Sequence, residues 1–169
     1  ELPERMSSRS MASALTQRLN FDRKSSLYRQ IHLHTNPEGK IANNAVQRVI
    51  MTSRSHGALR ILSQSPDGDE KCFQIMSDFY KAVQAVFKKD WDGMTPKTSR
   101  LVHSVGVISM GRVMEVAFQI CQARDFGDFC GVLESIRDQT HWTQGKWLIG
   151  NSDNVRERAW NEFQSIHPD

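Results

Sequence analysis

Apolar residues recur at steps of three and four along much of the chain, which is the spacing of helices that bury one face. The most regular run follows Asp69 and Glu70, two acids that suit a helix N-terminus. The run carries one apolar stripe: Cys72, Ile75, Met76, Phe79, Val83, Val86 and Phe87. This pattern predicts a core helix from Asp69 to Asp90, about 30 Å long, with Lys88 and Lys89 near its C-terminus.

Shorter runs with the same periodicity predict three more helices, over Arg9–Leu19, Asn43–Arg54 and Asp125–Gln139. Asn20 is expected to end the first helix, and Asn43 or the neighbouring Asn44 is expected to cap the second. The third helix places three apolar side chains on one face: Phe129, Leu133 and Ile136.

The stretch Leu101–Ile120 is largely apolar and predicts one or two buried helices. Thr98 or Ser99 is the expected cap, and an interruption is expected near Gly106 or Gly111. A short capped helix, a glycine break and a second helix would resemble a helix-turn-helix. The second helix is too apolar to read base edges, so packing in the core is the favoured interpretation.

Strand-like alternation is confined to Leu27–Leu33, which precedes the turn-forming residues Asn36–Gly39. No internal repeat or low-complexity segment divides the chain. We therefore expect a mainly α, compact helical domain over residues 1–169, with at most a short strand or hairpin.

Composition favours an intracellular protein. The chain has 169 residues, of which 38% are hydrophobic and 24% charged, and its longest apolar runs are too short to cross a bilayer. Cys72, Cys121 and Cys130 leave an odd thiol and lack a CxxC spacing, which favours a reducing, cytoplasmic environment. Cys121 and Cys130 are interpreted as free core thiols. The start, Glu1–Arg5, has neither an initiator Met nor signal-peptide features, so we expect this chain to be part of a larger protein.

Familiar catalytic signatures are absent from the sequence, including phosphate-binding loops, nucleophile elbows and zinc-type Cys and His spacings. We expect no catalytic residue, cofactor or metal ligand in this chain. His32 and His34 are interpreted as surface residues rather than ligands. The tryptophans of the C-terminal part are interpreted as anchors for that segment rather than as platforms for bases: Trp142, Trp147 and Trp160.

The basic residues are concentrated in the N-terminal part. Residues 1–64 contain ten Lys and Arg against four acids, whereas the remainder contains twelve against fifteen. Such an asymmetry is compatible with a polyanionic partner and equally with a solvated basic face. If DNA is the partner, the candidates for phosphate contact are cations near helix ends and in loops: Arg48, Arg54, Arg60, Lys88, Lys89, Lys97 and Arg100.

Several short segments, in order along the chain, resemble one protein family: Leu19–Ile31, Phe79–Val83, Phe87, Trp91, Lys97, Ser99, Leu101, Gly106 and Arg158–Gln164. The first is similar to the family's "LN.DP.SP.Y..I" segment, with Arg23 and Ser26 at its proline positions. The last is similar to its "WN..QN" element, with Ser165 at the final Asn. Together they resemble the C-terminal region of the DGQHR-domain, DndB-like family. The motif that names the family lies in an N-terminal ParB-like portion and does not occur in this chain.

This resemblance implies a bacterial or phage protein associated with DNA modification and antiviral defence, and in some members with transcription regulation. We therefore expect a helical region that contributes to DNA binding. One alternative is a protein-interaction or oligomerisation module, with a second copy or another defence protein as partner and no membrane contact. The other is the supporting half of a ParB-like nuclease or nucleotide hydrolase whose reactive residues lie in the missing N-terminal part.

Overall fold

The computed structural model describes residues 2–144 together with Asn161 and Gln164, and it confirms a mainly α fold. A parallel pair of two-residue strands joins Ile31 to Ile41, so the predicted strand over Leu27–Leu33 is present only in part. The elements in chain order are α1 (Leu2–Phe21), β1 (Ile31–His32), β2 (Ile41–Ala42), α2 (Asn43–His56), α3 (Ala58–Leu62), α4 (Gly68–Val86), α5 (Lys88–Trp91), α6 (Ser104–Gln119), α7 (Phe126–Glu134) and the 3-10 turn η1 (Arg137–Gln139).

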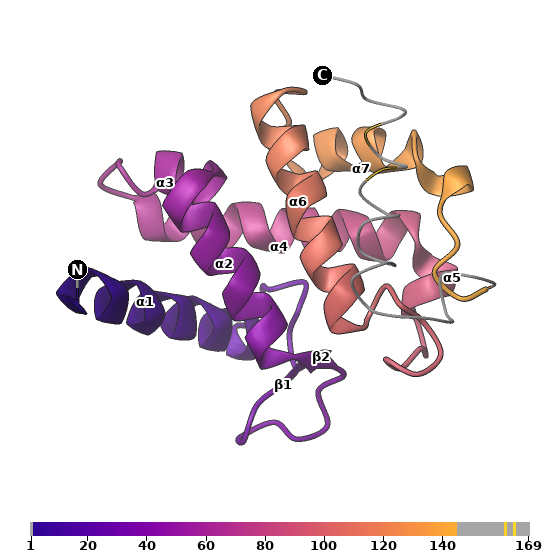
Figure 1. Ribbon diagram of the computed structural model, residues 1–169, viewed down its shortest axis with the longest axis horizontal. Helices are drawn as coiled ribbons and strands as arrows, with labels where there is room; N and C mark the ends of the chain where they lie inside the picture. The colour runs from indigo at the N-terminus through magenta and orange to yellow at the C-terminus, as the bar shows by residue number, and fades with distance from the viewer. Residues whose placement is uncertain (1, 145–160, 162–163, 165–169) are drawn as a thin grey trace.

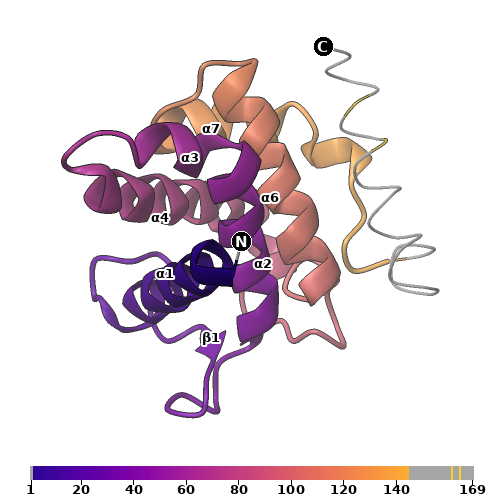
Figure 2. The same ribbon diagram turned by 60° about the vertical axis from the view of Figure 1, so that its left-hand side comes forward.

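The helices pack in contacting pairs around α4. Helix α1 lies against α2, α2 lies against α3 and α6, and α7 packs on α4. The N-terminal end of α1 and the short helix α5 lie on opposite sides of the molecule (Figure 1). In the turned view, α3 and α7 lie at one end and the small sheet at the other (Figure 2). Within the described residues, no helix combines the length and apolar character that crossing a membrane requires.

Helix α1 is longer than predicted, because it begins at Leu2 rather than Arg9 and ends at Phe21. Asn20 lies inside the last turn, where its buried side chain organises the following loop. Its Oδ1 accepts hydrogen bonds from the Ile31 backbone N–H (3.1 Å) and from Asn36 Nδ2 (3.3 Å). The buried Asn20 amide thus ties the end of α1 to the start of β1.

The predicted cap of α2 is wrong. Ala42 is the N-cap, without a side-chain hydrogen bond, because its extended backbone is already part of β2. Asn43 lies in the first turn and accepts a hydrogen bond from Gln47 Nε2 (2.9 Å). Helix α3 was not expected from the sequence; only Gly57 separates it from α2.

The long helix predicted over Asp69–Asp90 is interrupted at Phe87, whose backbone (φ −107°, ψ 41°) is not helical. Lys88 and Lys89 therefore belong to α5 rather than to the end of α4. The change of direction allows Trp91 to be buried and to donate from Nε1 to Gln30 Oε1 (2.8 Å). Helix α4 therefore ends where the Trp91 indole meets Gln30 of a loop distant in sequence, and local periodicity does not predict such a contact.

Helix α6 is continuous, so the predicted interruption near Gly106 or Gly111 is wrong. Both glycines serve close packing instead. A Cβ on Gly106 would overlap the backbone of Arg100 and Leu101, and one on Gly111 would lie 2.8 Å from Val49 of α2. Glycine at 111 therefore lets α6 approach α2 closely.

The cap of α6 also differs from the expectation. Thr98 and Ser99 stabilise the preceding turns by accepting from the backbone N–H groups of Thr95 (2.8 Å) and Leu101 (3.2 Å). The helix itself begins after His103, whose Nδ1 accepts from the Val105 N–H (3.1 Å). Because Nδ1 is an acceptor, the capping imidazole is neutral.

Acid should weaken this cap. Burial, assisted by the positive charge of Arg100, lowers the pKa of His103 below its ordinary value of about 6.5. The neutral His103 imidazole therefore contributes fully to the free energy of unfolding above about pH 6.5. This contribution is lost as the pH falls from about 6.5 through the lowered pKa of His103. We expect the free energy of unfolding of wild type to fall by more than that of His103→Asn between pH 7.5 and 5, since Asn caps without titrating. Urea unfolding at each pH measures this difference, and equal losses would rule out the cap.

Helix α7 begins after Asp125, which caps it by accepting from the Asp128 N–H (2.9 Å), and it ends at Glu134, before the predicted Gln139. The predicted apolar face is confirmed, because its three members are buried: Phe129, Leu133 and Ile136. Cys130 is half-buried, but Cys121 is exposed because it follows the end of α6, so its assignment to the core is wrong.

Trp142 confirms the predicted anchoring of the C-terminal segment. Its ring is buried against Phe87, with centroids 6.4 Å apart, and its carbonyl accepts from the Arg100 N–H (2.8 Å). Trp147 and Trp160 lie outside the described residues.

Candidate nucleic-acid interface

The seven nominated cations fall into two groups, one before α4 in the chain and one after it. Arg48, Arg54 and Arg60 lie on α2 and α3, which precede α4, whereas the remaining four follow it: Lys88, Lys89, Lys97 and Arg100. Helix α4 has 19 residues and is therefore about 28 Å long. Arg60 follows Leu59, whose carbonyl oxygen lies 3.6 Å from Cys72 Sγ near the start of α4, whereas Lys88 follows the C-terminal end of α4, so the seven residues do not form a single surface.

Helices α2 and α3 present one polar stripe. Arg48, Thr52 and Ser55 are exposed and follow one another at spacings of four and three on α2, so they share a face. Arg60 of α3 is also exposed, and its guanidinium lies beside the end of α2, with Nη1 3.5 Å from the Ser55 carbonyl oxygen. The stripe thus continues from one helix onto the next.

Arg112 of α6 joins this stripe, although it was not among the nominated residues. Arg48 and Arg112 line the same shallow hollow between α2 and α6, about 100 Å³ in volume. The close approach of Gly111 to Val49 brings these two helices together. In the sequence, Arg112 is a polar position in an apolar helix, and only the helix contact places it near Arg48.

Arg54 differs from its neighbours because it is half-buried. Its Nη1 is enclosed and has no hydrogen-bond partner among the described residues. Its charge acts on Cys72 of α4: burial raises the pKa of that thiol to about 11, and the guanidinium opposes the rise. Arg54 therefore lies partly beneath the stripe, with less of its charge available to a ligand.

Acidic residues are nearly absent from these helices. The sequence has no Asp or Glu between Glu38 and Asp67, and the one acid of α6 is Glu115. Glu115 Oε2 accepts from the Ala58 N–H (2.8 Å) at the start of α3 and from Gln119 Nε2 (3.2 Å). A Cβ on Gly57 would overlap this carboxylate, so glycine makes room for it.

We call this surface the α2–α3–α6 face and define it by five exposed residues: Arg48, Thr52, Ser55, Arg60 and Arg112. It combines three guanidinium groups with two hydroxyl groups. The face is cationic because its three guanidinium groups outnumber the carboxylate of Glu115 beside it, which keeps its negative charge while it accepts hydrogen bonds from neutral N–H groups.

The second group of cations is interspersed with acids. Lys88 Nζ lies 3.3 Å from Asp92 Oδ2, and Asp90 is half-buried beside Lys89, with its pKa raised by burial. Lys97 is exposed, whereas Arg100 is half-buried and tied by its backbone N–H to Trp142. This group therefore presents a mixed surface rather than a cationic one.

Metal-binding clusters are not found in the part of the chain that the structure describes: no three or more His, Cys, Asp or Glu residues gather there. His32 and His34 are both exposed, and His32 Nδ1 lies 3.0 Å from the Pro37 carbonyl oxygen.

No protein-family model, curated protein or solved structure matches this chain. Its function must therefore be inferred from the charge and geometry of its own residues.

Proposed function

We propose that this chain is a DNA-binding helical module that holds the phosphate backbone of a duplex on the α2–α3–α6 face. One observation carries the proposal: Arg48, Arg60 and Arg112 come from three helices to one surface whose nearby acid, Glu115, is engaged internally. The resemblance to DndB-like proteins, which are associated with DNA modification and defence, supports the same class of partner.

The chemistry of the face suits phosphate groups. A guanidinium donates two parallel hydrogen bonds to phosphate oxygens, and the hydroxyls of Thr52 and Ser55 can donate further ones. Arg48 and Ser55 are seven residues apart on α2, or about 10 Å along its axis. Duplex DNA carries one charge per about 1.7 Å of its axis, so several phosphates lie within reach. Contacts of this kind position a duplex without reading its sequence.

The test is a salt series. We expect the triple variant Arg48→Ala/Arg60→Ala/Arg112→Ala to bind a labelled random-sequence duplex more weakly than wild type. Each lost phosphate contact lowers the slope of log K against log salt by about 0.9, so the slope should fall by about 2.7. Fluorescence anisotropy between low and physiological salt measures both quantities.

The matched control removes three cations from the other end of α4. The variant Lys88→Ala/Lys89→Ala/Lys97→Ala changes the net charge by the same amount and should keep the wild-type slope. If the slope of log K against log salt fell equally in both triple variants, binding would depend on net charge alone, and the proposed face would be contradicted. Absence of wild-type binding at low salt would reject it altogether.

A protein-interaction module is the second candidate, because two large apolar side chains are more than half exposed. Ile61 of α3 is 54% exposed, and Ile120 at the end of α6 is 52% exposed. Large apolar side chains exposed in this way can pack into the apolar centre of an interface with a partner. Self-association in sedimentation velocity that is insensitive to salt, together with no DNA binding, would favour this candidate.

A further inference from the structure

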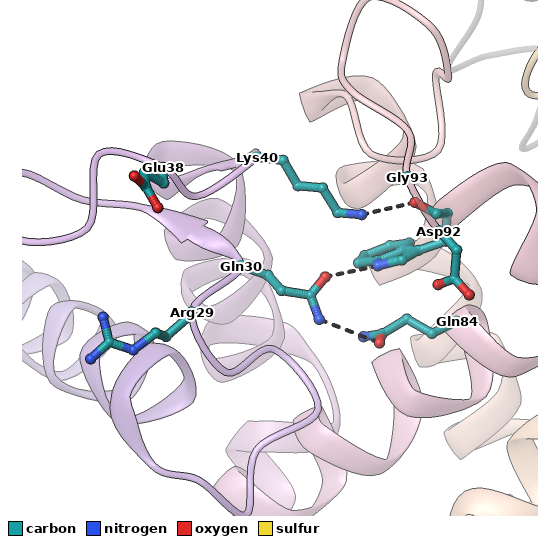
Figure 3. A pocket seen from close by; sticks show the side chains of 8 residues that line it. Arg29, Gln30, Glu38, Lys40, Gln84, Asp92 and Gly93 are labelled. Atoms are coloured by element: carbon teal, nitrogen blue, oxygen red, sulfur yellow. Dashed lines mark hydrogen bonds between the residues drawn. The ribbon is translucent and has the colours of Figure 1, made fainter.

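A polar pocket of about 380 Å³ lies between the loop around β1 and β2 and the end of α4 with α5. Its principal lining residues come from both sides and include two amides, two cations and an indole: Arg29, Gln30, Lys40, Gln84, Trp91 and Asp92. Figure 3 shows Lys40 and Gln30 reaching across the pocket toward the side that carries Gln84, Asp92 and Gly93. The pocket shares no lining residue with the five residues that define the α2–α3–α6 face.

Hydrogen bonds between residues more than fifty positions apart hold the walls of this pocket. Lys40 Nζ donates to the Trp91 carbonyl (2.8 Å), and Trp91 Nε1 donates to Gln30 Oε1 (2.8 Å). Gln84 donates to the Ser26 carbonyl (3.0 Å), to which Gln30, only four residues from Ser26, also donates (2.9 Å). The lining groups are therefore positioned before any ligand arrives, which lowers the entropic cost of binding.

Arg29 is held on the rim in a left-handed backbone conformation, with φ 55°. Its N–H donates to the Asn20 carbonyl (2.8 Å), and its own carbonyl accepts from Asn36 Nδ2 (3.1 Å). A non-glycine residue rarely adopts this conformation, and such strained residues concentrate at ligand sites. Arg29 lines the pocket, but its exposed guanidinium extends away from Lys40 and Gln84 (Figure 3), with Nε 3.2 Å from Tyr28 Oη.

Lys40 is a half-buried cation with unused hydrogen-bonding capacity. Burial lowers its pKa, because the charged ammonium has lost part of its hydration, while Asp92 opposes the effect. Among the described residues, one of its three N–H donors is used, on the Trp91 carbonyl. Asp92 is paired with Lys88 (3.3 Å). Lys40 can therefore gain from an anion that enters the pocket.

Gln84 offers a neighbouring donor and acceptor. Its Nε2 gives one hydrogen to Ser26, and its Oε1 receives one contact, from Gln30 Nε2 at 3.4 Å. An amide has two N–H donors and two lone pairs, so one of each remains on Gln84. A side-by-side donor and acceptor is the arrangement with which Gln pairs with the N6 and N7 edge of adenine.

We propose that this pocket binds a single adenine nucleotide, with the phosphate on Lys40 and the base edge against Gln84. A volume of about 380 Å³ is within the range of small-molecule sites. The carboxylates of Glu38 and Asp92 limit the net positive charge, which favours one phosphate over a polyphosphate. The nucleotide can come from solution or from an unpaired stretch of nucleic acid, and this proposal is independent of the α2–α3–α6 face.

Calorimetric titration of the whole chain with AMP, adenosine and inorganic phosphate tests the proposal. AMP should bind more tightly than adenosine or inorganic phosphate, because only AMP engages both the Lys40 ammonium and the Gln84 amide. Lys40→Gln removes the charge but keeps an N–H donor for the Trp91 carbonyl, and Gln84→Met removes the amide at similar volume. Each should weaken AMP binding about tenfold while melting temperature is retained, since one good contact to a base or phosphate amounts to about that factor.

The control Arg48→Ala should leave AMP binding unchanged, and Gln84→Met should leave duplex binding unchanged. Each of the two proposed sites can therefore be rejected without rejecting the other. A competing unpaired oligo(dA) that displaces AMP would identify a strand as the source, and failure to displace would identify the free nucleotide. AMP affinity equal to that of inorganic phosphate, or unaffected by both variants, would overturn the proposal.

Discussion

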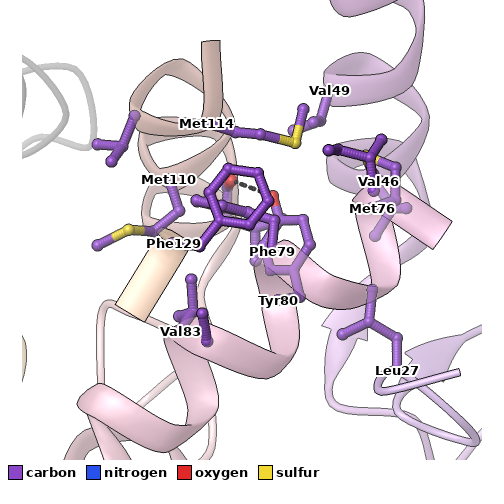
Figure 4. Packing of buried hydrophobic residues seen from close by; sticks show 14 of the residues in the cluster. Leu27, Val46, Val49, Met76, Phe79, Tyr80, Val83, Met110, Met114 and Phe129 are labelled. Atoms are coloured by element: carbon purple, nitrogen blue, oxygen red, sulfur yellow. Dashed lines mark hydrogen bonds between the residues drawn. The ribbon is translucent and has the colours of Figure 1, made fainter. Parts of the chain in front are cut away.

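Replacing Phe79 with alanine is expected to lower the free energy of unfolding by about 3–5 kcal/mol, the usual cost of truncating a buried aromatic ring. Phe79 lies on α4, has no exposed surface and contacts two rings edge to face. Its centroid is 5.1 Å from that of Tyr80 and 5.2 Å from that of Phe129 on α7 (Figure 4). The substitution would open a cavity where α4 and α7 meet, in addition to removing the ring contacts.

Urea unfolding followed by circular dichroism measures this loss. Phe21→Ala is the matched control, because Phe21 at the end of α1 is 39% exposed and should lose less than about 1 kcal/mol. Phe79→Leu should fall between the two, since it keeps much of the buried volume. A loss below about 1 kcal/mol for Phe79→Ala would show that the α4–α7 contact is not part of the stable core.

Gly106→Ala is expected to destabilise the protein by about 3 kcal/mol, although alanine normally stabilises a helix relative to glycine by about 1 kcal/mol. Gly106 lies in the first turns of α6, against the turn that precedes the helix. A methyl group there would overlap the carbonyl of Arg100 and the Cα of Leu101. Both obstacles are backbone atoms that cannot rotate away, so the helix and the turn must separate.

Gly131→Ala in α7 is expected to have the opposite effect on stability. A Cβ at position 131 meets no heavy atom within 4 Å, so helix propensity alone should act and stability should rise by up to about 1 kcal/mol. Thermal and urea unfolding of both variants compares the signs directly. If Gly106→Ala were also stabilising, the close contact between α6 and its preceding turn would be refuted.

Helix periodicity was a reliable guide to which faces are buried. The stripe from Cys72 to Val83 lies in the core, and Phe129, Leu133 and Ile136 are buried as predicted. Such patterns are local, because side chains three and four residues apart share a face wherever the helix lies. The helical fold class follows from the same local rule and could be predicted without knowledge of any long-range contact.

Helix ends were less predictable, for a physical reason. Ala42 precedes α2 because its backbone belongs to β2, and α4 ends at Phe87 where Trp91 turns toward Gln30. His103 caps α6 in place of the stronger capping residues Thr98 and Ser99, which stabilise turns instead. In each case a partner elsewhere in the fold outweighs the local capping preference.

The sequence by itself determined that the chain is mainly helical, which side of each main helix is buried, and that its N-terminal part is basic. Only the tertiary structure decided which cations share a surface. It placed Arg48 near Arg112 across a glycine contact, and it left Lys88 and Lys89 at the far end of α4. It also assembled the Gln84 pocket from segments more than fifty residues apart. Which side of a helix is buried follows from residue type and local spacing. Which residues of different helices come together depends on how the helices pack, and local spacing does not encode that packing.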